Sequence, residues 1–310
     1  MTDFTPYDEL PVIRDGLRVG WFENGPDDQA GRFALQTPER IKAALELVRE
    51  GRMFSLNADI DLIDPPLFGR MASQRVVSDY GALVRDDYLD HFNPQAASQW
   101  DALGHVAFAS NTFYGGRSRA EIDAGADGIQ HLARRGVAGR AVLVDVEPAI
   151  DDPFSAQPIS VADVRECLDS ADLVLGAGDV LIVNTGYLRR YTQLNPAQKI
   201  EFARQPVVCA GLERSEDMLR FLWDSGASAV ASDNPALEVW PGSTDPAADR
   251  WQYLHRSLLG LLGLHIGEFW WLADLVDACR VDGRFEVFLT SAPLNITGGA
   301  SSTANALAFK

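Results

Sequence analysis

The stretch RAVLVDVE at residues 140–147 is an apolar run rich in valine, which is typical of a buried strand. GDVLIVNTG at 178–186 has the same character and is entered from a Gly-Asp turn. Between them lies SVADVRECLDSADL at 160–173, which has helical spacing and begins with an S-x-x-D capping signature. This alternation of buried strands with a helix predicts an α/β fold.

The alternation extends on both sides of this region. It predicts a mixed central sheet, and no break in the pattern indicates a second domain. The segment GGASSTAN at 298–305 is rich in glycine and serine, and we expect a tail or loop there. The other expected helices cover 38–51, 215–226, 249–263 and 269–280, and the other expected strands cover 106–110, 227–233, 264–268 and 284–294.

Composition limits the classes of partner. The chain has 310 residues and a formal net charge of −17, which argues against a nucleic-acid-binding face. Its three cysteines are widely spaced and odd in number, so we expect a reducing compartment and no disulfide framework. The N-terminus does not resemble a signal peptide, and no uncharged run is long enough to span a membrane. We therefore expect a cytoplasmic protein that binds neither nucleic acid nor membranes.

The segment HFNPQAASQWDALGHV at 91–106 concentrates polar side chains. Side chains alternate between the two faces of an extended chain, so Gln95, Gln99, Asp101 and His105 would share one face if the segment is extended. An aspartate and a histidine on one face could hold a divalent ion or form an acid–base pair. A buried structural histidine beside a turn-forming aspartate is the alternative.

Two further segments carry candidate site residues. His255 and Glu268 are thirteen positions apart, which would place them on nearly opposite faces of one helix. They can meet only if the helix breaks, and Gly263 is a suitable stop. In ASDNPALEVWPG at 231–242, Asp233 and Asn234 follow a strand and serve either turn closure or a binding site.

At these residues the sequence resembles the cyclase family that contains bacterial kynurenine formamidase and isatin hydrolase. The family signature is H-x-G-T-H-x-D-x-P-x-H, and residues 95–105 read Q-A-A-S-Q-W-D-A-L-G-H. The resemblance extends over about residues 90–300. It is also carried by NTFYGG (111–116), VLVDVE (142–147), GDVLIVNTGY (178–187), ASDNPALEV (231–239) and VFLTSAPLNITGG (287–299).

The resemblance implies a fold and an organisation. Family members have the swivelling β/β/α fold, so we expect one domain over 1–310, with an irregular part at 1–90 and the family-like core at 91–300. Because family members commonly form dimers or tetramers, we also expect a homodimer or homotetramer.

The resemblance also implies a metal site that departs from the family pattern. Asp101 aligns with the metal-bridging aspartate and His105 with the proton-shuttling histidine, while His255 and Glu268 align with the distal metal ligands. Gln95 and Gln99 replace the two metal-binding histidines. An amide oxygen is a weaker and harder ligand than imidazole, which favours Mn²⁺ or Mg²⁺ over Zn²⁺. We expect Asp101, His255 and Glu268 as the main ligands, with Gln95 and Gln99 as weak ones.

The leading hypothesis is a hydrolase that cleaves an amide, lactone or related C–N or C–O bond of a small, cyclic or aromatic molecule. Asp101 would help to hold a metal-activated water, and His105 would carry a proton to the leaving group. Two alternatives stay open: metal-free hydrolysis of an imine or strained ring by Asp101 and His105, and a non-catalytic ligand-binding protein. The residues expected to contact substrate are Trp100, Phe113, Tyr114, Asp233, Asn234 and Trp240.

Overall fold

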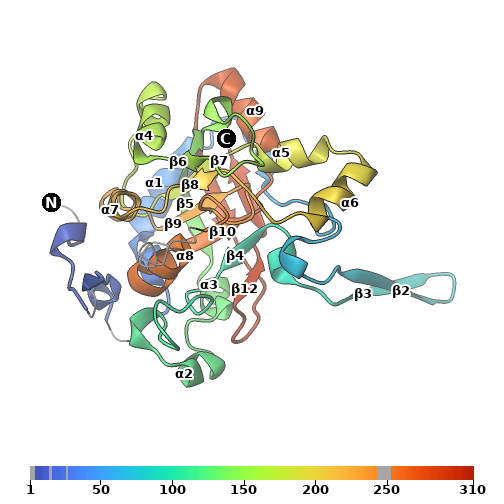
Figure 1. Ribbon diagram of the computed structural model, residues 1–310, viewed down its shortest axis with the longest axis horizontal. Helices are drawn as coiled ribbons and strands as arrows, with labels where there is room; N and C mark the ends of the chain where they lie inside the picture. The colour runs from blue at the N-terminus through green and yellow to red at the C-terminus, as the bar shows by residue number, and fades with distance from the viewer. Residues whose placement is uncertain (1–3, 14–15, 26, 243–252) are drawn as a thin grey trace.

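A nine-stranded mixed sheet forms the centre of the molecule (Figure 1). The structure is a computed structural model and describes residues 4–13, 16–25, 27–242 and 253–310. The strand order is β1-β13-β11-β5-β7-β9-β10-β4-β12. The strands are β1 (Met53–Ser55), β4 (Gln99–Asp101), β5 (Val137–Asp145), β7 (Val180–Asn184), β9 (Ala229–Ser232), β10 (His265–Glu268), β11 (Glu286–Ser291), β12 (Ser301–Thr303) and β13 (Ala306–Phe309).

Four parallel strands occupy the middle of the sheet, in the order β5, β7, β9 and β10. Antiparallel strands flank them on both sides, with β11 beside β5 and β4 beside β10. The valine-rich run at 140–147 lies in β5 as far as Asp145, and every residue of β7 is buried. The predicted α/β class with a mixed sheet is confirmed.

The two faces of the sheet carry separate apolar cores. Val142 and Val144 of β5 pack on one face with helices α4 (Val161–Ser170) and α7 (Glu216–Asp224). Ala141 and Leu143 pack on the other with α3 (Ile129–Arg135) and α9 (Ala273–Asp282). This separation follows from the alternation of side chains along a strand. The remaining α-helices are α1 (Pro38–Ala44), α2 (Arg119–Asp123), α5 (Tyr187–Thr192), α6 (Pro196–Arg204) and α8 (Leu254–Ser257).

Several sequence expectations need correction. Residues 106–110 form turns and not a strand, because Phe108 packs against the backbone of Gly260. The expected tail at 298–305 contains β12, which pairs with β4, and β13 follows it between β1 and β11. Small residues such as Ser301 and Ser302 give little sequence signal for a strand. The expected helix at 249–263 is described only from residue 253 onward, and its first part lies outside the described residues.

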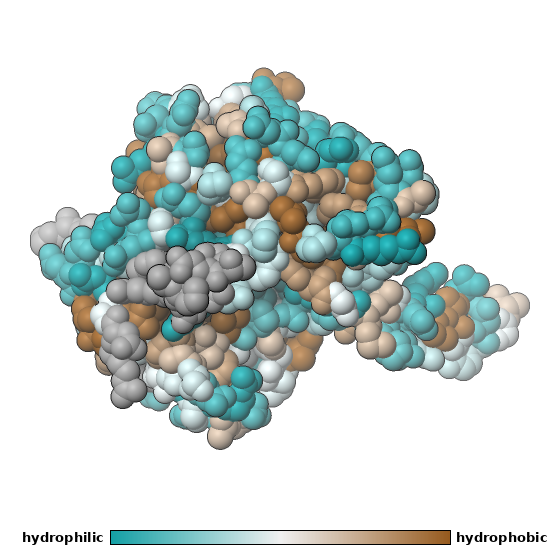
Figure 2. Space-filling view, viewed as in Figure 1, coloured by the Kyte–Doolittle hydropathy of each residue, from teal (hydrophilic) through white to brown (hydrophobic). Residues whose placement is uncertain are grey.

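A hairpin projects from the body of the molecule, formed by β2 (Gln74–Tyr80) and β3 (Val84–Asp90) (Figure 1). It falls within the region expected to be irregular. One face carries ion pairs between Arg75 and Asp87 and between Arg85 and Asp79. Exposed apolar side chains lie among polar ones on the hairpin (Figure 2), namely Tyr80, Leu83, Val84, Tyr88 and Leu89. The two remaining strands, β6 (Pro158–Ile159) and β8 (Gly211–Leu212), form a short parallel pair.

Among the described residues, no helix combines the length and the apolar character that a membrane crossing requires.

Candidate metal centre

Asp101, His255 and Glu268 converge in the interior, and a ligand atom from each lies within 4.8 Å of the others. His255 Nε2 is 3.1 Å from Glu268 Oε1 and 3.5 Å from Asp101 Oδ2. The side chains of Asp101 and Glu268 are almost completely inaccessible to solvent. The structure thus brings together two stretches that are about 150 residues apart in the chain, as the sequence analysis expects.

The pairing of β4 with β10 explains why these carboxylates face one another. In this antiparallel pair Gln99 lies opposite Glu268, and Asp101 lies opposite Ile266. Directly opposed residues point to the same side of a sheet, so Gln99, Asp101 and Glu268 share one face. Trp100 lies between them in sequence and therefore points to the other face.

A break in the backbone brings His255 close to Glu268. The chain passes from α8 through a π-helical turn at Leu258–Leu262 and stops at Gly263. Gly263 has φ of +70°, a left-handed conformation that disfavours side chains. The chain then enters β10, which carries Glu268. The predicted role of Gly263 as the helix stop is confirmed.

Glu238 is a site residue that the sequence analysis does not assign. Its Oε2 lies 2.7 Å from His255 Nδ1, so the imidazole N–H donates to this carboxylate. Its Oε1 accepts a hydrogen bond from the backbone N–H of Leu254 at 3.0 Å. These two contacts orient the ring and direct Nε2 toward Asp101 and Glu268, as outer partners of metal-binding histidines do. An acidic residue in the apolar run ALEVW was the available sequence signal.

The electrostatics of the cluster indicate a shortage of positive charge. Burial raises the pKa of Glu268. Burial would also raise the pKa of Asp101, but the nearby His105 and His255 outweigh it and lower that pKa. Burial opposes protonation of His255 as well, yet Glu238 and the other two carboxylates raise its pKa well above the usual value. One imidazole thus faces three buried carboxylates.

Several buried oxygens in the same cluster have no hydrogen-bond partner and are suited to bind a cation. Neither carboxylate oxygen of Asp101 has a hydrogen-bond partner, although both are buried. Gln99 Oε1 is also buried without a partner. A buried carboxylate is costly unless it is paired or coordinates a metal. Two carboxylates and an imidazole are a usual donor set for divalent ions, so these residues could hold one.

The two glutamines occupy different places. The Gln99 amide donates a hydrogen bond to Glu268 Oε2, so Gln99 lies beside the three main ligands. The Gln95 amide nitrogen is 3.3 Å from both ring nitrogens of His105. Gln95 belongs to a 3₁₀ turn at Pro94–Ala96 and not to an extended strand, which is why the expected four-residue face does not form. The structure supports a position for Gln95 at His105 and gives no contact between Gln95 and the three main ligands.

His105 lies at the edge of the cluster. Its Nε2 is 3.9 Å from Asp101 Oδ1, and its side chain is about a quarter exposed. Burial lowers the pKa of His105, although the Asp101 carboxylate opposes this effect. His105 therefore stands between the buried carboxylates and the solvent-connected cavity next to them.

A cavity of about 280 Å³ adjoins the cluster. Ligand pockets are commonly about 300–1,000 Å³, so this one suits a small molecule. Its polar lining comes from Arg70, His105, Glu238, His255 and Glu268. Its apolar lining comes from Phe68, Val106, Pro235, Ala236, Trp240 and Tyr253.

Of the aromatic residues expected to contact substrate, Trp240 lines this cavity. Trp100 lies instead in the opposite core, where its ring packs edge-on against Trp270 at 4.9 Å. Phe113 is buried, and Tyr114 donates a hydrogen bond to Asp28 at 2.6 Å in a separate hollow. The alternation along β4 turns Trp100 away from the site, so we no longer assign Trp100, Phe113 or Tyr114 to it.

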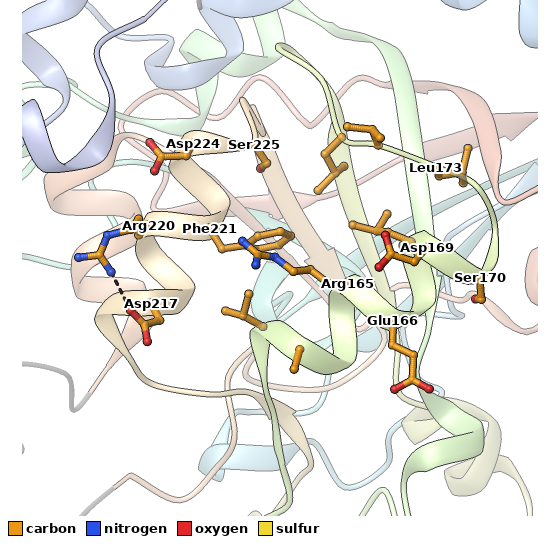
Figure 3. Close-up of a pocket in the computed structure, with 15 residues that line it drawn as sticks. Arg165, Glu166, Asp169, Ser170, Leu173, Asp217, Arg220, Phe221, Asp224 and Ser225 are labelled. Carbon is orange, nitrogen blue, oxygen red and sulfur yellow. Dashed lines mark hydrogen bonds and ion pairs between the residues drawn. The ribbon is translucent and has the colours of Figure 1, made fainter.

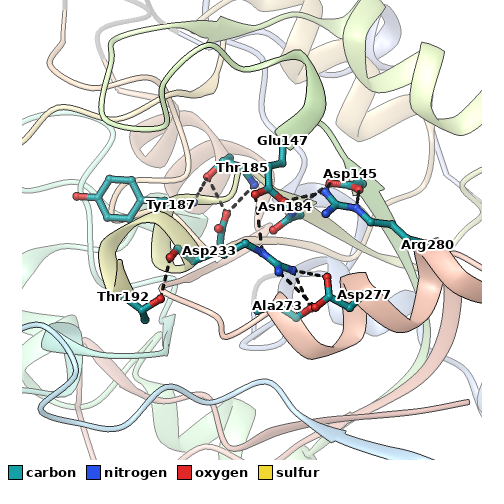
Figure 4. A network of polar contacts seen from close by, with 11 residues as sticks. Asp145, Glu147, Asn184, Thr185, Tyr187, Thr192, Asp233, Ala273, Asp277 and Arg280 are labelled. Carbon is teal, nitrogen blue, oxygen red and sulfur yellow. Dashed lines mark hydrogen bonds and ion pairs between the residues drawn. The ribbon is translucent and has the colours of Figure 1, made fainter. Parts of the chain in front are cut away.

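Asp233 and Asn234 also lie outside the cavity lining. Asp233 accepts hydrogen bonds from the backbone N–H and hydroxyl of Thr185, each at 2.7 Å, within a polar network beside β5 and β7 (Figure 4). The Asn234 amide donates to the carbonyls of Ala210 and Leu237. These bonds shape the loop that carries Glu238. The turn-closing alternative for Asp233 and Asn234 therefore fits the contacts.

A larger hollow lies elsewhere, between α4 and α7 (Figure 3). It measures about 1,320 Å³ and is bordered by surface residues such as Arg165, Asp217 and Arg220. Arg220 there is already paired with Asp217 at 2.7 Å. The group of metal-ligating side chains found among the described residues adjoins the smaller cavity, which is lined by His255 and Glu268, and we take this cavity as the site.

Replacing Glu238 by glutamine is expected to weaken metal binding. A single carbonyl oxygen would have to serve both the Leu254 N–H and His255 Nδ1, so the imidazole would lose its fixed orientation. Loss of such an outer partner typically lowers metal affinity by roughly 10–100-fold. Competition against a chelating dye measures the change. Glu213→Gln, which alters a carboxylate bonded to Ser215, is the control; equal affinities in both variants would contradict the orienting role.

The chain matches the family model described as "Putative cyclase" over residues 52–239 and belongs to that family. Comparison with curated proteins gives no match.

Solved structures share the fold. A crystal structure described as a novel cyclase has a TM-score of 0.83 and 31% identity, over 94% of this chain and all of that one. Isatin hydrolase A from Ralstonia solanacearum has a TM-score of 0.64 and 15% identity, over 88% and 98% of the two chains. Isatin hydrolase A from Labrenzia aggregata, bound to benzyl benzoate, has a TM-score of 0.62 and 14% identity, over 83% of this chain and 93% of that one. The expected cyclase-family fold is confirmed.

Proposed function

We propose that this protein is a metal-dependent hydrolase that cleaves an amide, lactone or related C–N or C–O bond of a small molecule. The observation that carries the proposal is the buried cluster of Asp101, His255 and Glu268, in which the two oxygens of Asp101 have histidine nitrogens at 3.5 and 3.9 Å but no hydrogen-bond partner. Family membership and an adjoining cavity for a small ligand support it. Cyclic or aromatic acyl compounds suit the flat aromatic wall of that cavity.

The metal ligands are Asp101, His255 and Glu268, with Gln99 next to them. Because this set has one nitrogen and no thiolate, it favours Mn²⁺, with Zn²⁺ and Mg²⁺ as the other candidates. A bound divalent ion supplies Lewis-acid activation of water and of the scissile carbonyl. Glu238 keeps His255 in the tautomer that presents a free Nε2.

The other residues of the cavity hold the substrate and move the proton. His105 carries a proton to the leaving group, since its imidazole lies between Asp101 and the cavity. Gln95 contacts the His105 ring and limits its movement. Trp240 and Tyr253 lie 5.7 Å apart at an interplanar angle of 33° and offer an apolar wall for a planar ring.

Metal analysis tests the proposal directly. Protein purified without chelators is expected to contain about one divalent ion per chain, and removal with EDTA is expected to abolish hydrolysis of whichever cyclic amide or lactone is turned over. Readdition of Mn²⁺ should restore the rate. Activity that is unaffected by EDTA in metal-free protein would overturn the proposal and favour direct water activation by Asp101 and His105.

A further inference from the structure

Arg70 is a charged residue of the cavity that the proposed hydrolysis leaves without a task. It lines the same cavity as His105, His255 and Glu268. Its guanidinium donates a hydrogen bond to the Gln95 carbonyl and lies 5.0 Å from the centre of the Phe68 ring. Among the described residues, no carboxylate oxygen lies within 4.0 Å of its nitrogens.

Like Arg70, the buried or partly buried Arg32, Arg135 and Arg214 donate to backbone carbonyls and have no ion pair among the described residues, whereas three other arginines are paired with carboxylates. Arg140 lies 2.7 Å from Asp179, Arg280 lies 2.7 Å from Asp145, and Arg189 lies 2.7 Å from Asp277. A guanidinium removed from water is costly unless its charge is paired. Arg70 is distinguished by its place in the lining of the cavity, where the guanidinium donors not used by the Gln95 carbonyl can meet a ligand.

The carboxylates whose charges act on Arg70 are Glu268 and Asp101, and a bound divalent cation would take them from Arg70 as counter-ions. A divalent cation would balance Asp101 and Glu268, while Glu238 is hydrogen-bonded to His255. The cavity wall around Arg70 is apolar, with Phe68 and Trp240 close to one another at 5.9 Å. An anionic group of a ligand would complete this arrangement.

We propose that Arg70 is a specificity residue that binds a carboxylate of the ligand, while the ligand's planar ring rests against Trp240 and Tyr253. The guanidinium fork matches a carboxylate in a way that an ammonium group does not. The carboxylate has two chemical sources. It is an acid group already present on the substrate, or it is the carboxylate released when water adds to the acyl carbon and the C–N or C–O bond breaks.

This inference rests on the proposed function for the source of the carboxylate but is tested by binding alone. Benzoate and benzamide have nearly the same shape and differ in charge. Titration of each into Mn²⁺-loaded protein, followed by calorimetry, is expected to show about tenfold tighter binding of benzoate. Arg70→Met should abolish that preference, and Arg70→Lys should restore part of it. Arg75→Met, on the hairpin, is the matched control and should keep the full preference.

The outcomes separate the two proposals. An equal benzoate preference in the native protein and in Arg70→Met would overturn the role of Arg70, provided that Mn²⁺ still raises the Tm of the variant as it does for the native protein. If the preference for benzoate depends on Arg70 but the protein hydrolyses no substrate, the role of Arg70 is supported and the proposed hydrolase function is wrong.

Kinetics then identify the source of the carboxylate. If Arg70→Met raises KM only for substrates that carry an acid group, the carboxylate belongs to the substrate. If it weakens inhibition by the acid product and leaves the KM of neutral substrates unchanged, the carboxylate belongs to the product.

Discussion

Asp101→Asn is expected to abolish metal-dependent hydrolysis and to remove the stabilisation that metal gives the fold. Asp101 is completely buried, and neither of its oxygens has a hydrogen-bond partner, so its carboxylate is the part of the site best suited to a cation. Loss of a direct ligand should reduce affinity by more than the ~10²-fold that loss of an outer partner costs. The native protein should gain about 2.7 kcal/mol of stability at a metal concentration 100 times its Kd, and the variant should gain almost none.

Thermal unfolding with and without Mn²⁺ measures this effect independently of turnover. Without metal, the Tm of Asp101→Asn should fall below that of the native protein, because His105 and His255 favour the charged form of Asp101 in the folded state. Asp233→Asn removes another buried carboxylate, directly after the strand β9, and should keep the full metal-induced shift. If Mn²⁺ raises the Tm of Asp101→Asn as much as that of the native protein, Asp101 is not a metal ligand.

His105→Ala is expected to lower kcat by roughly 10²–10⁴-fold, the usual contribution of a general acid–base residue. Metal binding should persist, since His105 Nε2 is 3.9 Å from Asp101 and is not among the three main ligands. The loss of kcat should be smaller for substrates whose leaving group departs without a proton, because these substrates do not need proton transfer from His105. The measurement is kcat on a pair of substrates that differ in leaving group.

His131→Ala is a suitable control, since His131 contacts the Gly125 carbonyl outside the cavity. His131→Ala should leave kcat unchanged on both substrates. If His105→Ala retains native turnover on the poorer leaving group, the proton-shuttle assignment is wrong.

The fold could be predicted from local patterns where those patterns were strong. Valine-rich runs identified β5 and β7, and Gly263 marked the turn that brings His255 to Glu268. The strand β12 was missed because short serine-rich stretches carry no periodic signal. Residues 106–110 were read as a strand from their apolar content, although long-range packing of Phe108 gives them an irregular path.

The site could be predicted only in part, for a similar reason. Asp101, His255 and Glu268 were recovered through the family resemblance, and their distances agree with it. Glu238 and Arg70 were not assigned, because their roles depend on partners brought near by the tertiary fold. Trp100 was assigned to the substrate although the alternation that groups Gln99 with Asp101 directs it to the opposite core.

The position of β4 between β10 and β12 affects how the protein is made. Residues 99–101 leave the ribosome long before their neighbours at 266–268 and 301–303 exist. About 200 further residues must be added, which takes about 10–40 s at roughly 5–20 residues per second. Both edges of the segment around Trp100 stay unpaired until β10 is synthesised, about 165 residues after β4, and one edge stays unpaired until β12 follows.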